Sequence, residues 1–174
     1  YPNFTTAPDK LTTNQGFETA GGSPSTIPGW DFIVFNPSVA TLTRDTTTAA
    51  VGSASAKVHI VNGNDPYTYA VNIHPSTTVA INAGQQYGVS FWAKASESRT
   101  INITLWNGGA AQVAQELRIN TNWQQYQAVV RAPSTVAAAT MTIDLGRTIG
   151  DVWIDDVHMQ TGVHSVWRRD FDHG

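Results

Sequence analysis

Side chains suited to hydrogen bonding and ring stacking recur at alternate positions in four segments of the sequence. These segments are residues 86–95, 100–108, 123–131 and 140–146. Tryptophan rings offer flat apolar platforms, whereas amides, hydroxyls, carboxylates and ammonium groups donate or accept hydrogen bonds in defined directions. The side chains of this kind are Trp92, Lys94, Asn102, Thr104, Trp106, Gln125, Gln127 and Asp144. Their chemistry favours an uncharged ligand that carries many hydroxyl groups.

The same four segments alternate between apolar and polar residues, which is typical of half-buried β-strands. In the first segment, Val89 and Phe91 alternate with Ser90 and Trp92. Short alternating runs recur from Trp30 onward, and no segment carries the apolar stripe of an amphipathic helix. The sequence therefore predicts an all-β protein, a two-sheet antiparallel β-sandwich. We expect the apolar faces to form the core and the polar faces of the four segments to form one functional surface.

Composition and charge argue against several classes of partner. Charged residues make up 13% of the 174 residues and the net charge is −3, which gives no electrostatic reason to expect nucleic acid or an anionic membrane. The chain has no cysteine, which excludes thiol catalysis and disulfides and is compatible with a bacterial exported protein. It has no apolar run of about 18 residues. We expect a mature or excised segment of a secreted, extracellular protein.

Most of the chain predicts one domain of ordinary size. Residues 1–10 are polar, contain two prolines and predict a linker. Residues 11–160 carry the alternating runs and predict the β-sandwich module. For residues 161–174 two interpretations stay open, namely a tail ordered only by docking on the domain and the start of a further β-rich domain.

Five stretches of the sequence form a series along the chain. They are residues 14–18 (NQGFE), 28–30 (PGW), 83–95 (AGQQYGVSFWAKA), 122–126 (NWQQY) and 151–157 (DVWIDDV). Together they resemble the galactose-binding-like jelly-roll carbohydrate-binding modules of families four, nine, sixteen and twenty-two. The resemblance implies a jelly roll that binds a polysaccharide or oligosaccharide without turnover. It also implies a glycoside-degrading catalytic domain, such as a glycoside hydrolase, in the same polypeptide.

In the modules that the sequence resembles, sugar chains lie in a groove on the concave sheet and stack on aromatic rings. The resemblance assigns Asn102, Thr104 and Trp106 to the binding side. It also puts Asp144 where a sugar-contacting amide often lies. Tyr69, in the stretch NGNDPYTY, is a further candidate for the rim of the groove. Because a tryptophan on a sandwich strand more often packs than binds, a packing role for each tryptophan remains the alternative.

The resemblance also implies a structural calcium ion between the first and the last strand. It suggests Asp156 as the best side-chain ligand and Glu18 as the second, with backbone carbonyls near Gly16 and in the turn at residues 52–55. Carboxylates and carbonyls are the hard oxygen ligands that calcium prefers. The alternative is that both acids only cap turns.

Two other functional classes remain open. A β-sandwich polysaccharide lyase would use Tyr69, His74 and Arg118, although no motif joins these residues. A protein-binding or cell-surface adhesion domain would use the loops in place of the polar face. Nothing near His74 has the spacing of a second metal-binding histidine, so we expect a solvated or hydrogen-bonded strand residue there. The favoured prediction is a non-catalytic carbohydrate-binding module that targets an attached enzyme to its substrate.

Overall fold

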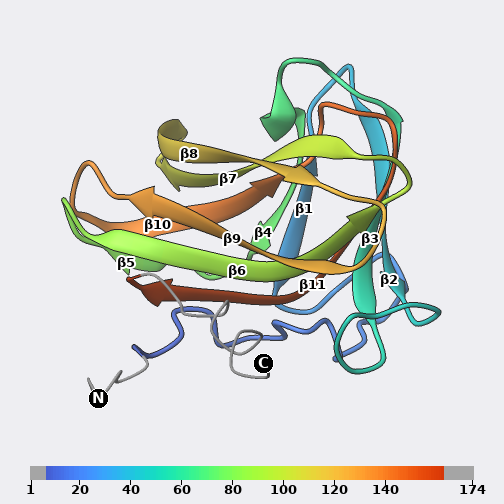
Figure 1. The fold of residues 1–174 in the computed structure, drawn as a ribbon, viewed down its shortest axis with the longest axis horizontal. Coiled ribbons are helices and arrows are strands. Elements are labelled where there is room, and N and C mark those ends of the chain that lie inside the picture. Colours follow the sequence, from blue (N-terminus) through green and yellow to red (C-terminus); the bar gives the residue numbers. More distant parts are fainter. Residues whose placement is uncertain (1–6, 163–174) are drawn as a thin grey trace, which may run out of the picture.

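The computed structural model describes residues 7–162 and shows two antiparallel β-sheets packed face to face (Figure 1). The six-stranded sheet has the order β1, β4, β10, β7, β8, with β5 paired to β10. Its strands are β1 (Trp30–Val34), β4 (Val71–Pro75), β5 (Val79–Ile81), β7 (Arg99–Asn107), β8 (Ala110–Ile119) and β10 (Val136–Asp144). The five-stranded sheet, in sheet order, consists of β2 (Val39–Asp45), β3 (Ser55–Asn62), β11 (Gly150–Thr161), β6 (Gln86–Ala95) and β9 (Gln124–Arg131). The predicted all-β sandwich is confirmed.

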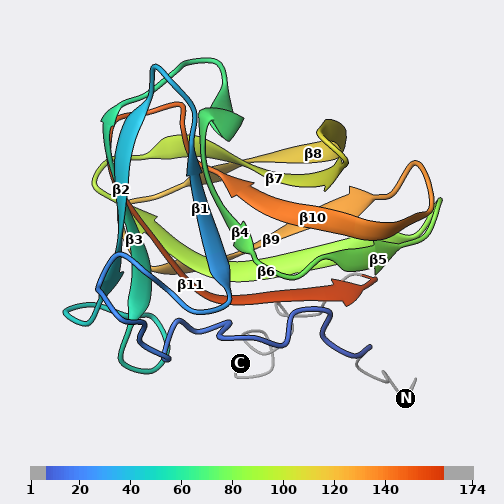
Figure 2. The same ribbon diagram turned by 180° about the vertical axis from the view of Figure 1, so that it is seen from behind.

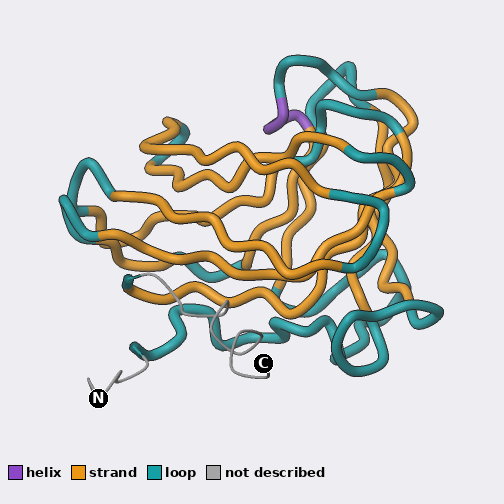
Figure 3. Tube along the Cα trace, viewed as in Figure 1, coloured by secondary structure: helices purple, strands orange, loops and turns teal. Residues whose placement is uncertain are grey.

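Helix is almost absent from this part of the chain (Figure 3). The only helix described between residues 7 and 162 is η1 (Thr68–Ala70), a single 3-10 turn that leads into β4. No helix within these residues is long and apolar enough to cross a membrane.

The core lies between the two sheets and is built from alternate residues of the strands. On β6, Val89 and Phe91 are fully buried, and on β7 the same holds for Ile101, Ile103 and Leu105. These are the apolar sets that the alternation predicts, because side chains two residues apart on a strand share a face. Each such side chain contributes about 1.5–3 kcal/mol when it is fully buried. The opposite faces of these strands carry the polar side chains, some of which are buried, such as Ser90 and Thr104.

The segment before β1 runs along β11, on the edge of the sandwich (Figure 1 and Figure 2). Lys10 N donates to Met159 O at 2.7 Å, and Val157 N donates to Gln15 O at 3.0 Å. Asp9 also accepts a hydrogen bond from Met159 N at 3.1 Å. These hydrogen bonds attach Asp9 and Lys10, which the sequence analysis assigns to a linker, to β11. Residues 1–6 of the predicted linker lie outside the described part of the chain, and so do residues 163–174 of the predicted tail.

The strands that carry the predicted binding residues belong to different sheets. β6 pairs with β9 in the five-stranded sheet, whereas β7 pairs with β10 in the six-stranded sheet. Because each sheet turns its inner face to the common core, the two outer faces point in opposite directions. The prediction that the four polar faces form one surface is therefore wrong. A period-two pattern identifies the buried face of a strand but not the neighbour with which the strand pairs.

Candidate functional site

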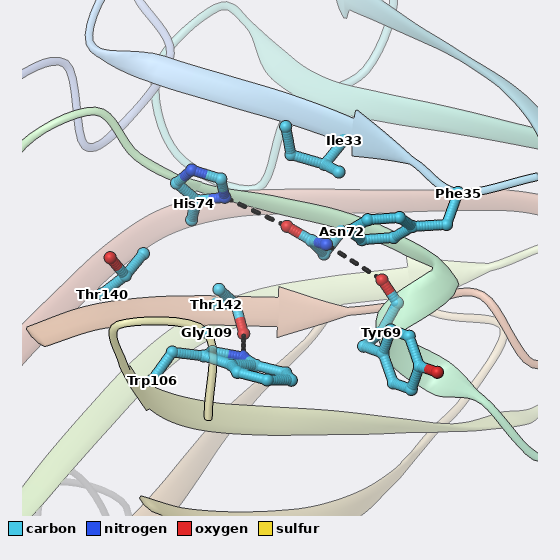
Figure 4. A pocket seen from close by; sticks show the side chains of 9 residues that line it. All are labelled: Ile33, Phe35, Tyr69, Asn72, His74, Trp106, Gly109, Thr140 and Thr142. Atoms are coloured by element: carbon cyan, nitrogen blue, oxygen red, sulfur yellow. Dashed lines mark hydrogen bonds between the residues drawn. The ribbon is translucent and has the colours of Figure 1, made fainter. Parts of the chain in front are cut away.

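The outer face of the six-stranded sheet holds a hollow of about 620 Å³ (Figure 4). Strands β1, β4, β10 and β7 supply its floor, while η1, the residue after β1 and the β7–β8 hairpin supply its rim. The lining residues are Ile33, Phe35, Tyr69, Asn72, His74, Trp106, Gly109, Thr140 and Thr142. Its volume falls within the range of about 300–1,000 Å³ that is usual for small-molecule sites.

Strand register brings the polar floor together from three strands. On β4, Asn72 and His74 flank the buried Ile73 and so point away from the core. On β10, Asp144 stands directly opposite Asn72 on one side and opposite Asn102 of β7 on the other. Amide, imidazole and carboxyl groups that lie far apart in the sequence therefore share one face.

Four aromatic side chains form a cluster that we call the aromatic wall: Phe35, Tyr69 and Trp106 line the hollow, and Tyr67 packs against Tyr69. Tyr69 is at the centre, with its ring centroid 6.0 Å from that of Phe35 and 6.1 Å from that of Trp106. The ring centroid of Tyr67 lies 5.8 Å from that of Tyr69. Phe35 and Tyr67 are each 50% exposed and Tyr69 is 41% exposed. Clustered, exposed rings of this kind commonly mark a binding surface.

Trp106 is held in a fixed orientation by its neighbour on β10. Its indole Nε1 donates to Thr142 Oγ1 at 2.8 Å, and its plane makes an angle of 77° with the ring of Tyr69 (Figure 4). The satisfied indole nitrogen leaves the apolar faces of the ring as its remaining surface for contact.

Beside the aromatic wall, two buried oxygen atoms have no hydrogen-bond partner among the described residues. They are Asn102 Oδ1 and Asp144 Oδ1. The other carboxyl oxygen of Asp144 accepts from Thr104 Oγ1 at 2.7 Å, and Asn102 Nδ2 donates to Thr68 Oγ1 at 3.0 Å. Burial raises the pKa of Asp144 to about 6, although hydrogen bonds from neighbouring threonines oppose the shift. Buried acceptors normally have donors, so these two oxygens, which lie beside the hollow and do not line it, have unused capacity for a water molecule.

His74 and Asn72 continue the polar floor toward β1. His74 Nδ1 lies 3.0 Å from Asn72 Oδ1, and Asn72 Nδ2 donates to Tyr69 O at 2.9 Å (Figure 4). Burial lowers the pKa of His74, which keeps the ring neutral, and the nearby Asp31 carboxylate opposes this only in part. The ring is thus hydrogen-bonded on its strand, as the sequence predicts.

Five of the nine predicted binding residues lie on this outer face. Tyr69 and Trp106 line the hollow, whereas Thr104 and Asp144 are each only 2% exposed and lie beside it with Asn102. The sequence analysis missed Ile33, Phe35, Asn72, Gly109, Thr140 and Thr142, and it gave His74 a role only in the lyase alternative. The alternation in Val71–Pro75 was visible, but only the pairing of β4 with β10 shows that Asn72 and His74 border the same hollow.

The other four predicted binding residues, Trp92, Lys94, Gln125 and Gln127, lie on the five-stranded sheet and do not share a site with Trp106. The ammonium group of Lys94 lies 4.7 Å from the ring centroid of Trp153 and 5.3 Å from that of Trp123. It also donates to Thr48 Oγ1 at 3.1 Å. This cation covers ring surface that a sugar would need for stacking. Trp123 and Trp153 are thus both engaged by the same lysine and are partly buried.

A turn at residues 50–54 gathers two of the acids near the expected calcium site. The carboxylate of Glu18 accepts from Ser53 N at 3.0 Å, from Ser53 Oγ at 2.7 Å and from Ala54 N at 3.1 Å. Asp155 Oδ2 accepts two further N–H groups of the same turn, at 2.9 and 3.0 Å. Asp155 is fully buried, and this burial raises its pKa to about 6. The turn is thus tied to the first loop and to β11.

The aspartate that faces this turn is Asp155, whereas the sequence analysis favoured its neighbour Asp156. Asp156 has a φ of 49° in the left-handed region, and the β11–β6 register shifts between Asp155 and His158. Asp156 Oδ1 lies 2.7 Å from His158 Nε2, so it is engaged elsewhere. The break in alternation at Asp156 turns the side chain of Asp155 toward the turn, whereas the resemblance suggested Asp156 as the ligand.

The side chains at this turn fit calcium poorly as they stand. Three protein donors already occupy the carboxylate of Glu18, and Arg44 donates at 2.7 Å to the carbonyls of Phe17 and Glu18. Gly16, the third predicted ligand, precedes these two carbonyls in the same loop. Residues 7–162 contain no cluster of three or more His, Cys, Asp or Glu side chains placed to hold a metal ion. A calcium ion would depend on Glu18 and backbone oxygens and would compete with the Arg44 guanidinium.

Comparison with known proteins gives one family. Residues 9–151 match the family described as "Carbohydrate binding domain". No curated protein sequence matches the chain. Among solved structures, the CBM22-1 xylan-binding domain of Paenibacillus barcinonensis Xyn10C is 11% identical, with a TM-score of 0.60 and coverage of 91% of this chain and 97% of that one.

Two further structures show how widely the architecture occurs. The N-terminal cellulose-binding domain of Cellulomonas fimi β-1,4-glucanase C is 19% identical, with a TM-score of 0.54 and coverage of 80% of this chain and 93% of that one. An arabinose-bound α-L-arabinofuranosidase, MgGH51, is 12% identical, with a TM-score of 0.71 and coverage of 92% of this chain but 27% of that one. Identities this low show a shared fold and nothing finer. The family match, in contrast, spans most of the 174 residues and confirms the resemblance seen in the sequence, and the chain belongs to the carbohydrate-binding domain family.

Proposed function

We propose that this domain binds an uncharged polysaccharide in the hollow on the outer face of the six-stranded sheet. The observation that carries the proposal is the position of the aromatic wall beside two buried acceptors without donors, Asn102 Oδ1 and Asp144 Oδ1. Rings stack on the apolar faces of pyranose sugars, and a water molecule can connect a sugar hydroxyl in the hollow to such acceptors beside it. No other described surface combines the two features.

The charges around the hollow favour a neutral chain over an acidic one. Asp31 of β1 lies next to His74, Glu116 stands opposite Asn102 on β8, and Asp144 lies buried beside the hollow. Arg147 contacts Glu116 and Asp65 at 3.0 and 2.8 Å, so its charge is already paired. A uronate carboxylate would meet like charges here, which disfavours its binding.

We propose that the domain acts by binding alone. One observation supports the lyase alternative, because Tyr69 and His74 line the same hollow. Its third residue, Arg118, lies on β8 opposite Thr100 and does not line the hollow. A lyase also needs an acidic sugar, which the surrounding carboxylates oppose. Binding without turnover needs neither Arg118 in the hollow nor an acidic sugar, so it fits the residues that line the hollow better.

We further propose that the domain belongs to a longer secreted polypeptide and directs an attached glycoside-degrading domain to its substrate. The supporting observation is that a similar fold makes up 27% of the α-L-arabinofuranosidase MgGH51. The test is hydrolysis of insoluble substrate by the full polypeptide, with and without Trp106→Ala. Equal rates on insoluble substrate would contradict the targeting role.

We also retain calcium as a proposal for the turn at residues 50–54. Its support is that Glu18, a mostly exposed carboxylate, and Asp155, a buried one, meet the same short turn. Oxygen atoms from such a turn are suitable calcium ligands. The poor fit of the occupied side chains is the argument against it, and metal removal decides between the two.

The function is tested by affinity electrophoresis and isothermal titration against xylohexaose, cellohexaose and β-1,4-galactotriose, with polygalacturonate as the acidic comparison. A reducing-end assay and an absorbance assay for unsaturated ends run alongside. We expect binding to at least one neutral glycan, none to polygalacturonate and no product. New reducing or unsaturated ends would instead establish an enzyme.

A further inference from the structure

The ring orientation of His74 is fixed by two successive hydrogen bonds. Tyr69 O is a backbone carbonyl and can only accept, so the 2.9 Å contact identifies the amide nitrogen of Asn72. The amide oxygen of Asn72 must then face His74 Nδ1, at 3.0 Å. Because that oxygen can only accept as well, Nδ1 of His74 carries the hydrogen. In the neutral ring, Nε2 is therefore an acceptor.

Nε2 has a second acceptor across from it. It lies 3.6 Å from Asp31 Oδ2, which is beyond hydrogen-bond distance, and Asp31 Oδ1 accepts from Ser76 Oγ at 3.1 Å. The side chain of His74 is 16% exposed and lines the hollow (Figure 4). Two acceptors that face each other at this separation cannot bond to one another, and each favours a donor group placed beside it on the side of the hollow. A sugar hydroxyl is such a donor.

We propose that His74 is a specificity-determining residue of the hollow, whose Nε2 accepts a hydrogen bond from a ligand hydroxyl and whose orientation Asn72 sets. This inference rests on the proposed function. Protonation would turn Nε2 into a donor directed at Asp31, so the hydroxyl would lose its acceptor. Binding should therefore weaken as the pH falls through the folded-state pKa of His74, which burial places below its ordinary value.

Two other titratable groups face this part of the sheet. Asp31 is paired with His74 across β1 and β4 and is 54% exposed. Asp144 is the titratable residue of β10, it stands opposite Asn72, and its pKa is raised to about 6 by burial. If binding weakens at low pH, variants must therefore show which of these groups is responsible. Asp144→Asn removes one titration, and Asp31→Asn removes the partner of protonated His74.

The first measurement is the ¹⁵N spectrum of the two imidazole nitrogens of His74, without ligand and then with xylohexaose or cellohexaose. We expect a protonated Nδ1 and an unprotonated Nε2 at neutral pH, and a shift of the Nε2 signal when the glycan binds. A spectrum in which Nε2 carries the hydrogen would overturn the proposal. This reading is independent of whether either glycan binds.

The second measurement is isothermal titration of His74→Phe, which keeps a ring of similar size without the acceptor. We expect binding to weaken at least about tenfold, with an unchanged melting temperature as the control for folding. In Asp144→Asn the acid-side loss should persist, and in Asp31→Asn it should move to lower pH. If His74→Phe binds like the parent, the proposal fails while the proposed function stands. If the parent binds none of the three neutral glycans, the proposed function fails first.

Discussion

Replacement of Trp106 by alanine distinguishes the binding site that the structure indicates from the one predicted from the sequence alone. The sequence analysis placed Trp92 and Trp106 on one binding surface, whereas the structure puts them on opposite faces of the sandwich. Trp106 follows the buried Leu105, points out of the sheet and contacts Tyr69 in the aromatic wall. Trp92 is also partly buried and on an outer face, so Trp92→Ala is a matched control.

The expected magnitudes follow from the contacts of Trp106. A central aromatic anchor contributes on the order of 2 kcal/mol to binding, which corresponds to about a 30-fold loss of affinity on truncation. The hydrogen bond to Thr142 is worth about 1 kcal/mol of folding stability, and the edge contact with Tyr69 contributes about 1 kcal/mol more. A loss of about 2 kcal/mol leaves a domain of ordinary stability, roughly 5–15 kcal/mol, folded at room temperature.

The assay is isothermal titration with the neutral glycan that the parent binds, together with a melting curve of each variant. We expect Trp106→Ala to lose most of its affinity and to melt as one cooperative transition. Trp92→Ala should keep the affinity of the parent. Parental affinity in Trp106→Ala, or a large loss in Trp92→Ala, would refute the assignment of the site to the six-stranded sheet.

Three further predictions follow from the acids and the amide. Burial raises the pKa of Asp144 from 3.8 to about 6, so the ionised group opposes folding and stability falls as the pH rises between these values. Asp144→Asn should therefore be more stable than the parent by on the order of 2 kcal/mol at pH 7 but not at pH 4, as measured by urea unfolding. Equal stability of both proteins at both pH values would contradict this. Asn102→Ala should alter the order of preference among neutral glycans more than the highest affinity, because a directional amide distinguishes hydroxyl orientations; an unchanged order in titrations against all three glycans would count against it. If calcium occupies the turn at residues 50–54, a chelator should lower the melting temperature of the parent and leave Glu18→Ala unaffected. Identical melting curves of the parent with and without chelator would exclude a stabilising calcium ion.

Much of the fold could be predicted because the alternation of apolar and polar residues within a strand identifies the face that is buried. The alternation in residues 86–95 and 100–108 identifies Val89, Phe91, Ile101 and Ile103 as core, and all four are fully buried. The absence of helical periodicity likewise predicted the all-β class. These features depend on neighbours along the chain, which a sequence displays directly.

The candidate site could be predicted only in part, because it depends on which strands pair. Trp92 and Trp106 occupy equivalent places in two alternating runs, yet strand pairing puts them in different sheets. Asn72 and His74 gain their importance from β10, whose contribution to the hollow lies about 70 residues later in the chain. The sequence also gives no sign that Asp156, which the resemblance suggested as a ligand, has a left-handed φ of 49° within its strand, because no glycine marks the position.

The indole N–H signals in a ¹H–¹⁵N spectrum test the location of the site most directly. Each of the six tryptophans contributes one such signal, and Trp92, Trp106, Trp123 and Trp153 report on the two outer faces. Titration with the bound neutral glycan should shift the Trp106 signal strongly and leave those of Trp92, Trp123 and Trp153 in place. A shift of Trp92 or Trp123 with an unmoved Trp106 would show that the saccharide binds the five-stranded sheet and would contradict the account.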